Sequence, residues 1–153
     1  MQAHFYEDLG RGKIGEQIFQ FLLKKMGYEV QDLSNDRMYQ KQGVDFRITN
    51  ETKDLLIDVK TDYVMYRTGN IFLELEDGPR LGWAKKTKAD LIFYIDHKNQ
   101  IVYLLKWEDC LNIIDSLRQV SFYNQDGIKM RGALLPITQL HQIRYQIIDL
   151  GDW

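Results

Sequence analysis

The segment at residues 55–61 constrains the fold of this chain more than any other, because it places two charges within a strand of core residues. Apart from Asp58 and Lys60, its residues are apolar or β-branched. Successive side chains of a strand point to opposite faces of the sheet, so Ile57 and Val59 share one face while Asp58 and Lys60 share the other. Charged groups in a mostly buried strand are unfavourable unless they are paired or bound to a metal ion. The segment therefore predicts a sheet with one apolar face and one charged face.

The residues before this segment predict a helix and the first strand of a β-hairpin. Strand-like residues at 43–49 are separated from the segment by turn-forming residues at 50–54. Between Gly10 and Gly27, apolar residues recur at the three- and four-residue steps of an amphipathic helix, which Gly27 ends. This apolar face consists of Ile14, Ile18, Phe21, Leu22 and Met26. Gly15 falls near it, and a glycine there lets the helix backbone approach a sheet closely.

The remainder of the chain adds further strands and two shorter helices. Strands are predicted at 71–76, 91–95 and 101–105, and weaker patterns suggest strands near 128–135 and 145–150. Helices are predicted at 82–88 and 107–117. A chain of 153 residues is long enough for one ordinary domain and short for two, so we expect residues 1–153 to form a single domain. The fold class we expect is α/β, with a central mixed β-sheet flanked by helices.

Composition excludes several classes of protein. Hydrophobic residues make up 44% and charged residues 27% of the chain, with only two prolines, which is typical of a globular protein. The longest apolar runs, at 91–95 and 101–105, are far shorter than the roughly 20 residues that cross a bilayer. The first eight residues carry polar and acidic side chains where a secretory signal needs a basic start and an apolar stretch. We therefore expect a cytoplasmic protein without a membrane partner.

Cysteine, histidine and net charge restrict the chemistry further. The single cysteine, Cys110, cannot form an internal disulfide, and three histidines far apart in the chain do not predict a zinc site. The net charge is −2, so any contact with nucleic acid has to come from local basic patches.

The charged face of the segment at 55–61 has the residue types that phosphodiester hydrolysis needs. This reaction requires an activated water and neutralisation of charge on the phosphate, and Mg²⁺ supplies both when carboxylates hold it. Asp45 and Asp58 are the candidate ligands. Residues two apart on a strand are separated by roughly 6.6 Å, so Lys60 can reach a water or phosphate beside a metal at Asp58. Glu16, at the edge of the helix's buried arc, can add a further carboxylate.

This order of residues resembles the PD-(D/E)xK nuclease superfamily, in which a helix with Glu precedes an acid at one strand start and acid-x-Lys on the next. The matching residues are Glu16, then Gly43-Val44-Asp45-Phe46, then Ile57-Asp58-Val59-Lys60-Thr61. Val44 stands where the eponymous motif has proline. The resemblance covers roughly the first hundred residues, including 70–74 and 87–91, which look like pieces of nuclease-like proteins from phages and mobile elements.

The resemblance implies a restriction-endonuclease-like core and an Mg²⁺-dependent endonuclease, with Mn²⁺ able to substitute. It implies metal ligation by Asp45, Asp58 and the backbone carbonyl of Val59, and catalytic roles for these two acids with Lys60 and Glu16. In the front half the strongest likeness is to the Holliday-junction-resolvase-like branch, which implies structure-directed cleavage of branched DNA. Because that action needs two active sites, it also implies a homodimer. Glu74 is a further acid for which the resemblance suggests a place near the site.

A basic segment provides candidate DNA contacts. Between residues 80 and 88, four cations surround a tryptophan, a composition suited to phosphate contact and base stacking. The predicted DNA-binding residues are Arg80, Trp83, Lys85, Lys86 and Lys88.

Each of these residues also has an explanation without chemistry. Asp58 and Lys60 on an exposed strand would be a solvated pair contributing under about 1 kcal/mol. Asp45 has a second explanation as a turn or strand-edge acid, although its position after Gly43 and before the apolar Phe46 fits an inward-facing carboxylate better. Glu16 is equally a helix-surface acid, and the basic segment equally a solvated helix. At the level of function, the alternative is a catalytically inactive DNA-binding or assembly module on the same fold, because a fold does not fix an activity. An RNA-directed or purely structural role has no positive signal in the sequence.

Overall fold

The structure, a computed structural model, describes residues 2–153, with side chains from residue 13 onward. Helix α1 (Gln2–Lys25) opens the chain and ends where the sequence predicts. Gly27 has a φ of 93°, which favours glycine, and its amide donates to the carbonyl of Lys24 at 3.1 Å. The Tyr28 amide donates to the Leu23 carbonyl at 3.0 Å, which completes a Schellman cap.

The larger of two β-sheets is mixed, as the sequence predicts. Its strands, in spatial order, are β1 (Glu29–Asp32), β2 (Phe46–Thr49), β3 (Asp54–Asp62), β6 (Leu91–Asp96), β7 (Ile101–Lys106) and β10 (Tyr145–Asp149). All neighbours are antiparallel except β3 and β6, which run parallel. The predicted hairpin is confirmed as β2 and β3, although β2 begins three residues later than the strand pattern at 43–49.

The second sheet is antiparallel. The sequence patterns do not indicate that its strands form a separate sheet. Its strands, in spatial order, are β5 (Arg80–Leu81), β4 (Asn70–Asp77), β9 (Lys129–Pro136) and β8 (Gln119–Tyr123). The predicted strands at 71–76 and 128–135 are confirmed as β4 and β9. The short α-helices are α2 (Arg37–Lys41), α3 (Met65–Thr68), α4 (Trp83–Lys86) and α5 (Trp107–Ile113). The 3₁₀ segments are η1 (Ile114–Ser116), η2 (Ile137–Gln142) and η3 (Leu150–Asp152). The helix predicted at 107–117 thus ends earlier and continues as a 3₁₀ turn.

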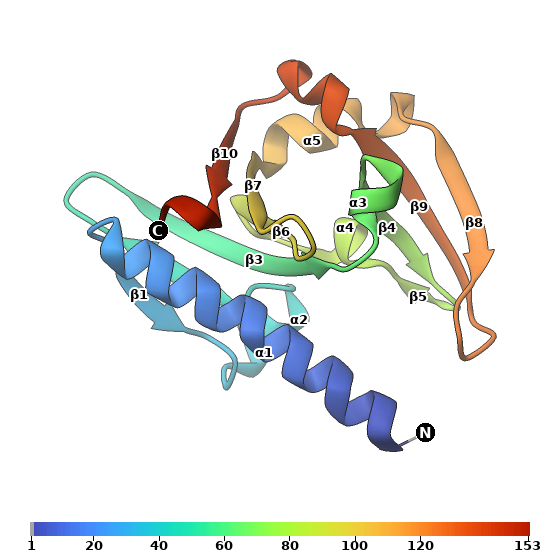
Figure 1. Cartoon of the computed structure of the whole chain (residues 1–153), viewed down its shortest axis with the longest axis horizontal. Helices are drawn as coiled ribbons and strands as arrows, with labels where there is room; N and C mark the ends of the chain where they lie inside the picture. Colours follow the sequence, from blue (N-terminus) through green and yellow to red (C-terminus); the bar gives the residue numbers. More distant parts are fainter. Residues whose placement is uncertain (1) are drawn as a thin grey trace.

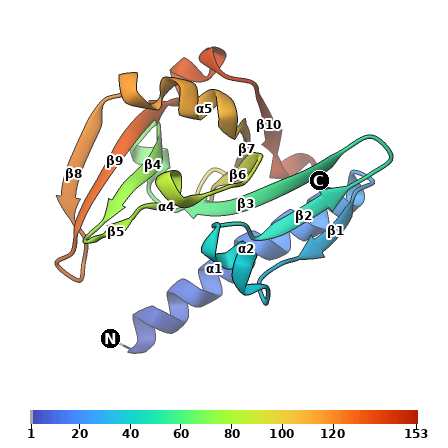
Figure 2. The same cartoon turned by 180° about the vertical axis from the view of Figure 1, so that it is seen from behind.

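The elements form layers around the mixed sheet. Helix α1 lies against one face of β1, β2 and β3, while the second sheet and α5 lie on the other side (Figure 1). The reverse view shows the same order of layers, with α1 behind the hairpin (Figure 2). Two separate apolar cores result. One, between α1 and the sheet, is built around Phe19, Phe46 and Phe93, and the other lies between the two sheets and includes Trp107 and Cys110.

The buried side of α1 is only partly the one predicted. Leu22 is buried and Ile18 and Met26 are partly buried, as expected, but Ile14 and Phe21 are exposed. The centre of the buried arc is instead Phe19, Leu22 and Leu23. Phe21 is 60% exposed, and its ring lies 5.2 Å from the Nζ of Lys25. A helix with apolar residues on most sides does not specify from sequence alone which of them turns inward.

Gly15 provides the close approach that the sequence predicts. A β-carbon there would collide with Oγ1 of Thr61 on β3 and would lie 3.3 Å from Cδ1 of Ile95 on β6. Glycine at this position therefore lets the helix cross the sheet without displacing the Thr61 side chain. Within the part of the chain that the structure describes, none of the helices has the length and apolar character needed to cross a lipid bilayer.

Candidate active site

The register of the hairpin brings Asp45 next to Asp58. Phe46 pairs with Ile57, so continuing the register by one residue sets Asp45 opposite Asp58. Directly opposed residues of antiparallel strands point to the same face. The Asp45 amide donates to the Ile57 carbonyl at 2.9 Å, one residue away from the strand register, and this bond holds the backbone of Asp45 against β3. Ile57 packs in the core under α1, so Asp58 points to the opposite face, and the Asp45 carboxylate reaches β3 beside it, at the end of β2.

The backbone around β3 fixes the Asp45 carboxylate. Because β2 begins only at Phe46, its strand hydrogen bonds do not reach Val59, and Asp45 Oδ2 accepts from the Val59 amide at 2.9 Å. At Val59 we predicted the carbonyl as a ligand; the contact observed at this residue is made by its amide, and ligation by the carbonyl stays a prediction. The approach to Asp45 is held by Gly43, whose φ is 65° and whose carbonyl accepts from Thr87 Oγ1 at 3.1 Å.

Asp58 is the most unusual carboxyl group of the site. It is 1% exposed, and its Oδ1 lies 3.2 Å from the Nζ of Lys60. Its Oδ2 is buried and has no hydrogen-bond partner among the described residues. Burial, followed by the nearby charge of Asp45, raises the pKa of Asp58 to about 7, and the ammonium of Lys60 opposes this rise. A buried carboxylate oxygen without a donor is the kind of atom that a cation would complete.

Lys60 links the mixed sheet to the second sheet. Its side chain is 30% exposed, and its Nζ lies 5.4 Å from the centroid of the Trp83 ring. The backbone amide of Trp83 donates to Oε1 of Glu74 at 3.3 Å. Burial raises the pKa of Glu74, whereas Lys60 lowers it, so these two groups are within electrostatic range of one another. Glu74, which the resemblance suggested as an additional acid, thus lies on the opposite wall from Lys60.

Glu16 approaches the carboxylates from α1. The side chain is half-buried. Desolvation, followed by the charges of Asp45 and Asp32, raises the pKa of Glu16. This electrostatic coupling to Asp45 fits the predicted position of the helix carboxylate, and its catalytic role stays a prediction.

The donor set fits a magnesium ion better than a metal that needs a complete protein cage. Among the residues with described side chains, no three histidine, cysteine, aspartate or glutamate side chains are grouped so that they could hold an ion. Asp45 and Asp58 therefore form a pair of carboxylates and not a closed site. Mg²⁺ commonly takes one or two carboxylates and completes its shell with waters and substrate phosphate. The two acids, with the unpartnered Oδ2 of Asp58, fit that requirement.

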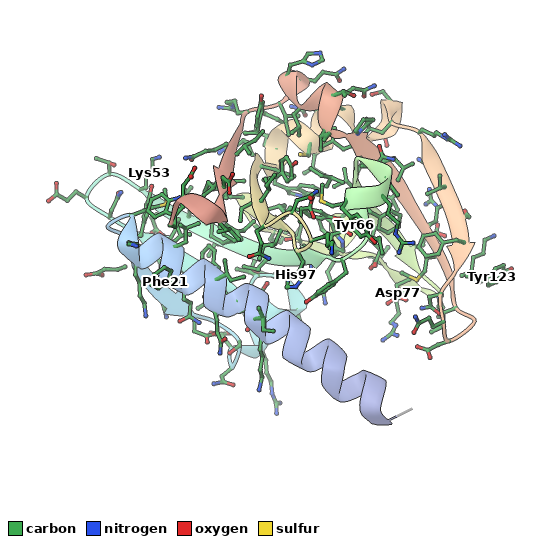
Figure 3. The ribbon with its side chains drawn as sticks, in the orientation of Figure 1. Phe21, Lys53, Tyr66, Asp77, His97 and Tyr123 are labelled. Carbon is green, nitrogen blue, oxygen red and sulfur yellow. The ribbon has the colours of Figure 1, made fainter. Side chains whose placement is uncertain are left out.

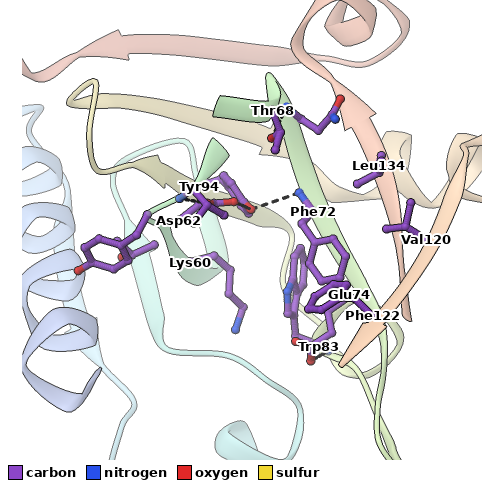
Figure 4. Close-up of a pocket in the computed structure, with 14 residues that line it drawn as sticks. Lys60, Asp62, Thr68, Phe72, Glu74, Trp83, Tyr94, Val120, Phe122 and Leu134 are labelled. Carbon is purple, nitrogen blue, oxygen red and sulfur yellow. Dashed lines mark hydrogen bonds between the residues drawn. The ribbon is translucent and has the colours of Figure 1, made fainter. Parts of the chain in front are cut away.

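A large cavity opens beside Lys60, between the two sheets. Its volume is about 710 Å³, and Lys60 and Glu74 lie on opposite walls (Figure 4). The floor is an ordered network in which Tyr94 Oη donates to Asp62 Oδ2 at 2.5 Å and accepts from the Phe72 amide at 3.2 Å. The predicted strand ends at Thr61, one residue before the observed end of β3 at Asp62. Continuing the alternation by one residue places Asp62 on the face of Asp58 and Lys60.

The predicted DNA-binding residues lie on and around α4. Lys85, Lys86 and Lys88 are exposed, and Lys86 shares a groove of about 350 Å³ with Arg37 and Lys41 of α2. Arg80 is also exposed and lies 4.0 Å from Asp77. The Trp83 ring is half-buried and packs against Trp107 at a centroid distance of 5.4 Å. Contact of this surface with DNA stays a prediction.

Comparisons of the chain with protein-family models, with curated proteins and with solved structures found no match. What the site can do is therefore inferred from its own residues.

Proposed function

We propose that this protein is a metal-dependent endonuclease that hydrolyses DNA phosphodiester bonds. The observation that supports this most is the meeting of Asp45, which directly precedes β2, with Asp58 on β3, where Lys60 lies 3.2 Å from the buried Asp58 carboxyl. Two carboxylates at a buried position repel one another unless a proton or a cation lies with them. The pKa of about 7 at Asp58 expresses this repulsion and burial together.

Asp45 and Asp58 would hold the ion, with Mg²⁺ expected and Mn²⁺ able to replace it. When bound, such an ion supplies a water of lowered pKa and neutralises charge on the phosphate oxygens. Because Asp58 keeps a proton up to about pH 7, it has to release that proton before it can serve as a ligand. Lys60 is positioned to orient the attacking water and to stabilise negative charge that develops on the phosphate. Glu16 supports this group from α1, and the lysines of α4 bind the DNA backbone.

Digestion of plasmid and branched DNA with and without Mg²⁺ tests the proposal. Wild type should cleave only with the ion, while Asp58→Ala and Lys60→Ala should lose cleavage. Matched controls come from the same hairpin: Lys53→Ala and Asp54→Ala remove the same residue types at its other end, where both side chains are exposed. Figure 3 shows Lys53 at this end of the hairpin. Both control variants should cleave like wild type. Cleavage that persists in both site variants would overturn the proposal.

The alternative is a DNA-binding or assembly module without turnover. It requires that the protein bind DNA while the carboxylate pair binds no ion. A Mg²⁺ titration by calorimetry, paired with a gel shift on the same preparation, separates the two. An absence of metal binding together with a DNA shift would favour the module.

A further inference from the structure

We infer that the cavity beside Lys60 receives one unpaired base of the DNA substrate, so that the enzyme prefers sites where a nucleotide next to the scissile bond is unpaired. This inference rests on the proposed function, because it uses the cavity's continuity with the carboxylate site. Lys60 belongs to both, since its Nζ contacts Asp58 and its side chain lines the cavity.

The walls of the cavity are suited to a flat aromatic ligand. Phe72 and Phe122 have their ring centroids 5.6 Å apart at an interplanar angle of 57°. Val120 and Leu134 add apolar surface from the same sheet. Aromatic side chains that stack on bases are the common means by which proteins hold unpaired nucleotides. The volume of about 710 Å³ lies within the roughly 300–1,000 Å³ typical of small-molecule sites.

A glycine on β9 sets the position of one aromatic wall. A β-carbon at Gly132 would collide with the Phe72 ring, so glycine allows this ring to lie flat against β9. Phe122 on β8 forms the other part of this aromatic wall, and its side chain is 45% exposed. An apolar ring that remains partly exposed at the mouth of a cavity has surface available for a ligand.

The charges of the lining favour a base over a phosphate. Among the described residues that line the cavity, Lys60 is the one cation, while Asp62 and Glu74 are carboxylates. A phosphate inside would be repelled by both acids, whereas a base is neutral and presents N–H donors. The sugar–phosphate backbone would then stay outside the cavity and near Lys60, whose Nζ lies 3.2 Å from the Asp58 carboxyl. A base inserted in this way positions the adjoining phosphate at the site.

Entry of a base into the cavity has a consequence for substrate choice. A base inside a duplex has to be unpaired and unstacked before it can enter, and the free-energy cost of doing so is least where the base is already unpaired. Bulges, junctions and single-stranded ends meet this condition. The cavity therefore gives a physical reason for discrimination by DNA structure.

Binding without cleavage tests the inference. Three oligonucleotides share one sequence: a perfect duplex, the same duplex with one bulged nucleotide, and the bulge with an abasic residue in place of that nucleotide. Affinities are measured by fluorescence anisotropy in EDTA. Stacking one base contributes about 1–3 kcal/mol, or roughly 5- to 150-fold, so wild type should bind the base-containing bulge at least fivefold more tightly than the abasic one. A bulged 2-aminopurine should lose fluorescence on binding.

Neighbouring residues of β8 provide the variants. Val120 and Phe122 line the cavity, whereas Tyr123 points outward and is 72% exposed (Figure 3). Phe122→Ala, and Val120→Trp, which fills the space, should reduce the base-to-abasic ratio to about one. Tyr123→Ala, the matched loss of a ring, should keep the wild-type ratio. Equal binding of the two bulges by wild type, or an unchanged ratio in both cavity variants, would overturn the inference.

Cleavage assays keep this outcome separate from the proposed function. If wild type cleaves DNA with Mg²⁺ but does not distinguish base from abasic bulge, the endonuclease proposal stands and the cavity inference falls. If wild type never cleaves, the proposed function fails, and with it the role of the cavity in cleavage.

Discussion

The two faces of β3 differ more than any other pair of surfaces in this protein. Toward α1, Ile57 is fully buried in a core where the Phe19 ring stacks on Phe46 with centroids 4.7 Å apart and meets Phe93 edge-on at 5.0 Å. Toward the second sheet, the next residue is the buried Asp58, whose Oδ2 has no partner among the described residues. One face stabilises the fold by apolar packing. The other face holds a buried carboxyl group whose charged form is electrostatically unfavourable. Adjacent residues of one strand therefore allow stability and chemistry to be varied separately.

The largest expected effect is the loss of cleavage in Asp58→Asn. The amide has nearly the shape of the carboxyl but cannot serve as an anionic ligand, so the rate should fall on the order of 10²–10³-fold or more. The metal-free stability should not fall, because a neutral side chain removes the repulsion from Asp45. Cleavage rates with Mg²⁺ and urea unfolding without it measure the two effects.

The matched change on the other face is Ile57→Val. It should lower the free energy of unfolding by about 0.5–1.5 kcal/mol and leave cleavage unchanged. If the valine variant loses cleavage as the asparagine variant does, the two faces are not separable.

A second prediction concerns the pH dependence of metal-free stability. The pKa of Asp58 is about 7 in the folded protein and near its usual 3.8 when unfolded, so between these values the folded state binds the extra proton. Stability from this group is fully present below about pH 4 and is lost as pH rises to about 7. At roughly 1.4 kcal/mol per pKa unit, the loss is at most about 4 kcal/mol. Urea unfolding of wild type and Asp58→Asn from pH 4 to 8 should show this slope only in wild type; parallel curves would contradict it.

The third prediction is stabilisation by Mg²⁺, which should depend on the same proton. An ion at one hundred times its dissociation constant adds about 2.7 kcal/mol to stability if it binds only the folded state. The rise in Tm should be larger at pH 8 than at pH 6, because Asp58 has lost its proton at the higher pH. Thermal unfolding with Mg²⁺ or with EDTA checks this. An equal rise in Asp58→Asn would show that the ion binds elsewhere.

The smallest expected effect comes from the face toward α1. Gly15→Ala would normally stabilise a helix interior by roughly 0.5–1 kcal/mol, but here the new methyl collides with Thr61. We expect a net loss of about 1 kcal/mol instead, as for modest overpacking. The double variant with Thr61→Ala should recover most of it in urea unfolding. Additive effects of the two substitutions would mean that the contact does not limit packing.

The sequence predicts the α/β class and the pairing of the two acids because both depend on local patterns. The turn after Thr49 is short, with the Asn50 amide donating to the Lys53 carbonyl, and it fixes the register that sets Asp45 opposite Asp58. The period of two then places Lys60 on the same face. Nothing further along the chain is needed for this part of the site.

The second sheet and the cavity could not be predicted in this way. Their walls depend on the pairing of β4 with β9, whose residues are more than fifty positions apart, and no local pattern specifies which strands share a sheet. Strand β1 has mostly exposed residues and lacks the alternation of a half-buried strand. Which side of α1 is buried likewise depends on what the helix packs against. Phe19 is buried, whereas Ile14 and Phe21 are exposed.

The parallel pairing of β3 with β6 determines when, during folding, the carboxylate site reaches its native structure. The hairpin closes over a few residues, but Ile57 meets Leu91 only after the chain of β4, β5 and α4 has been looped out, and such long-range closure is slow. The Leu56 amide then donates to Asp90 Oδ2 at 2.8 Å, which fastens the start of β6 to β3. Until that docking step, the carboxyl of Asp58 stays hydrated and titrates as an ordinary aspartate. In a refolding experiment, late proton uptake near pH 6 would therefore report the moment at which the strands join.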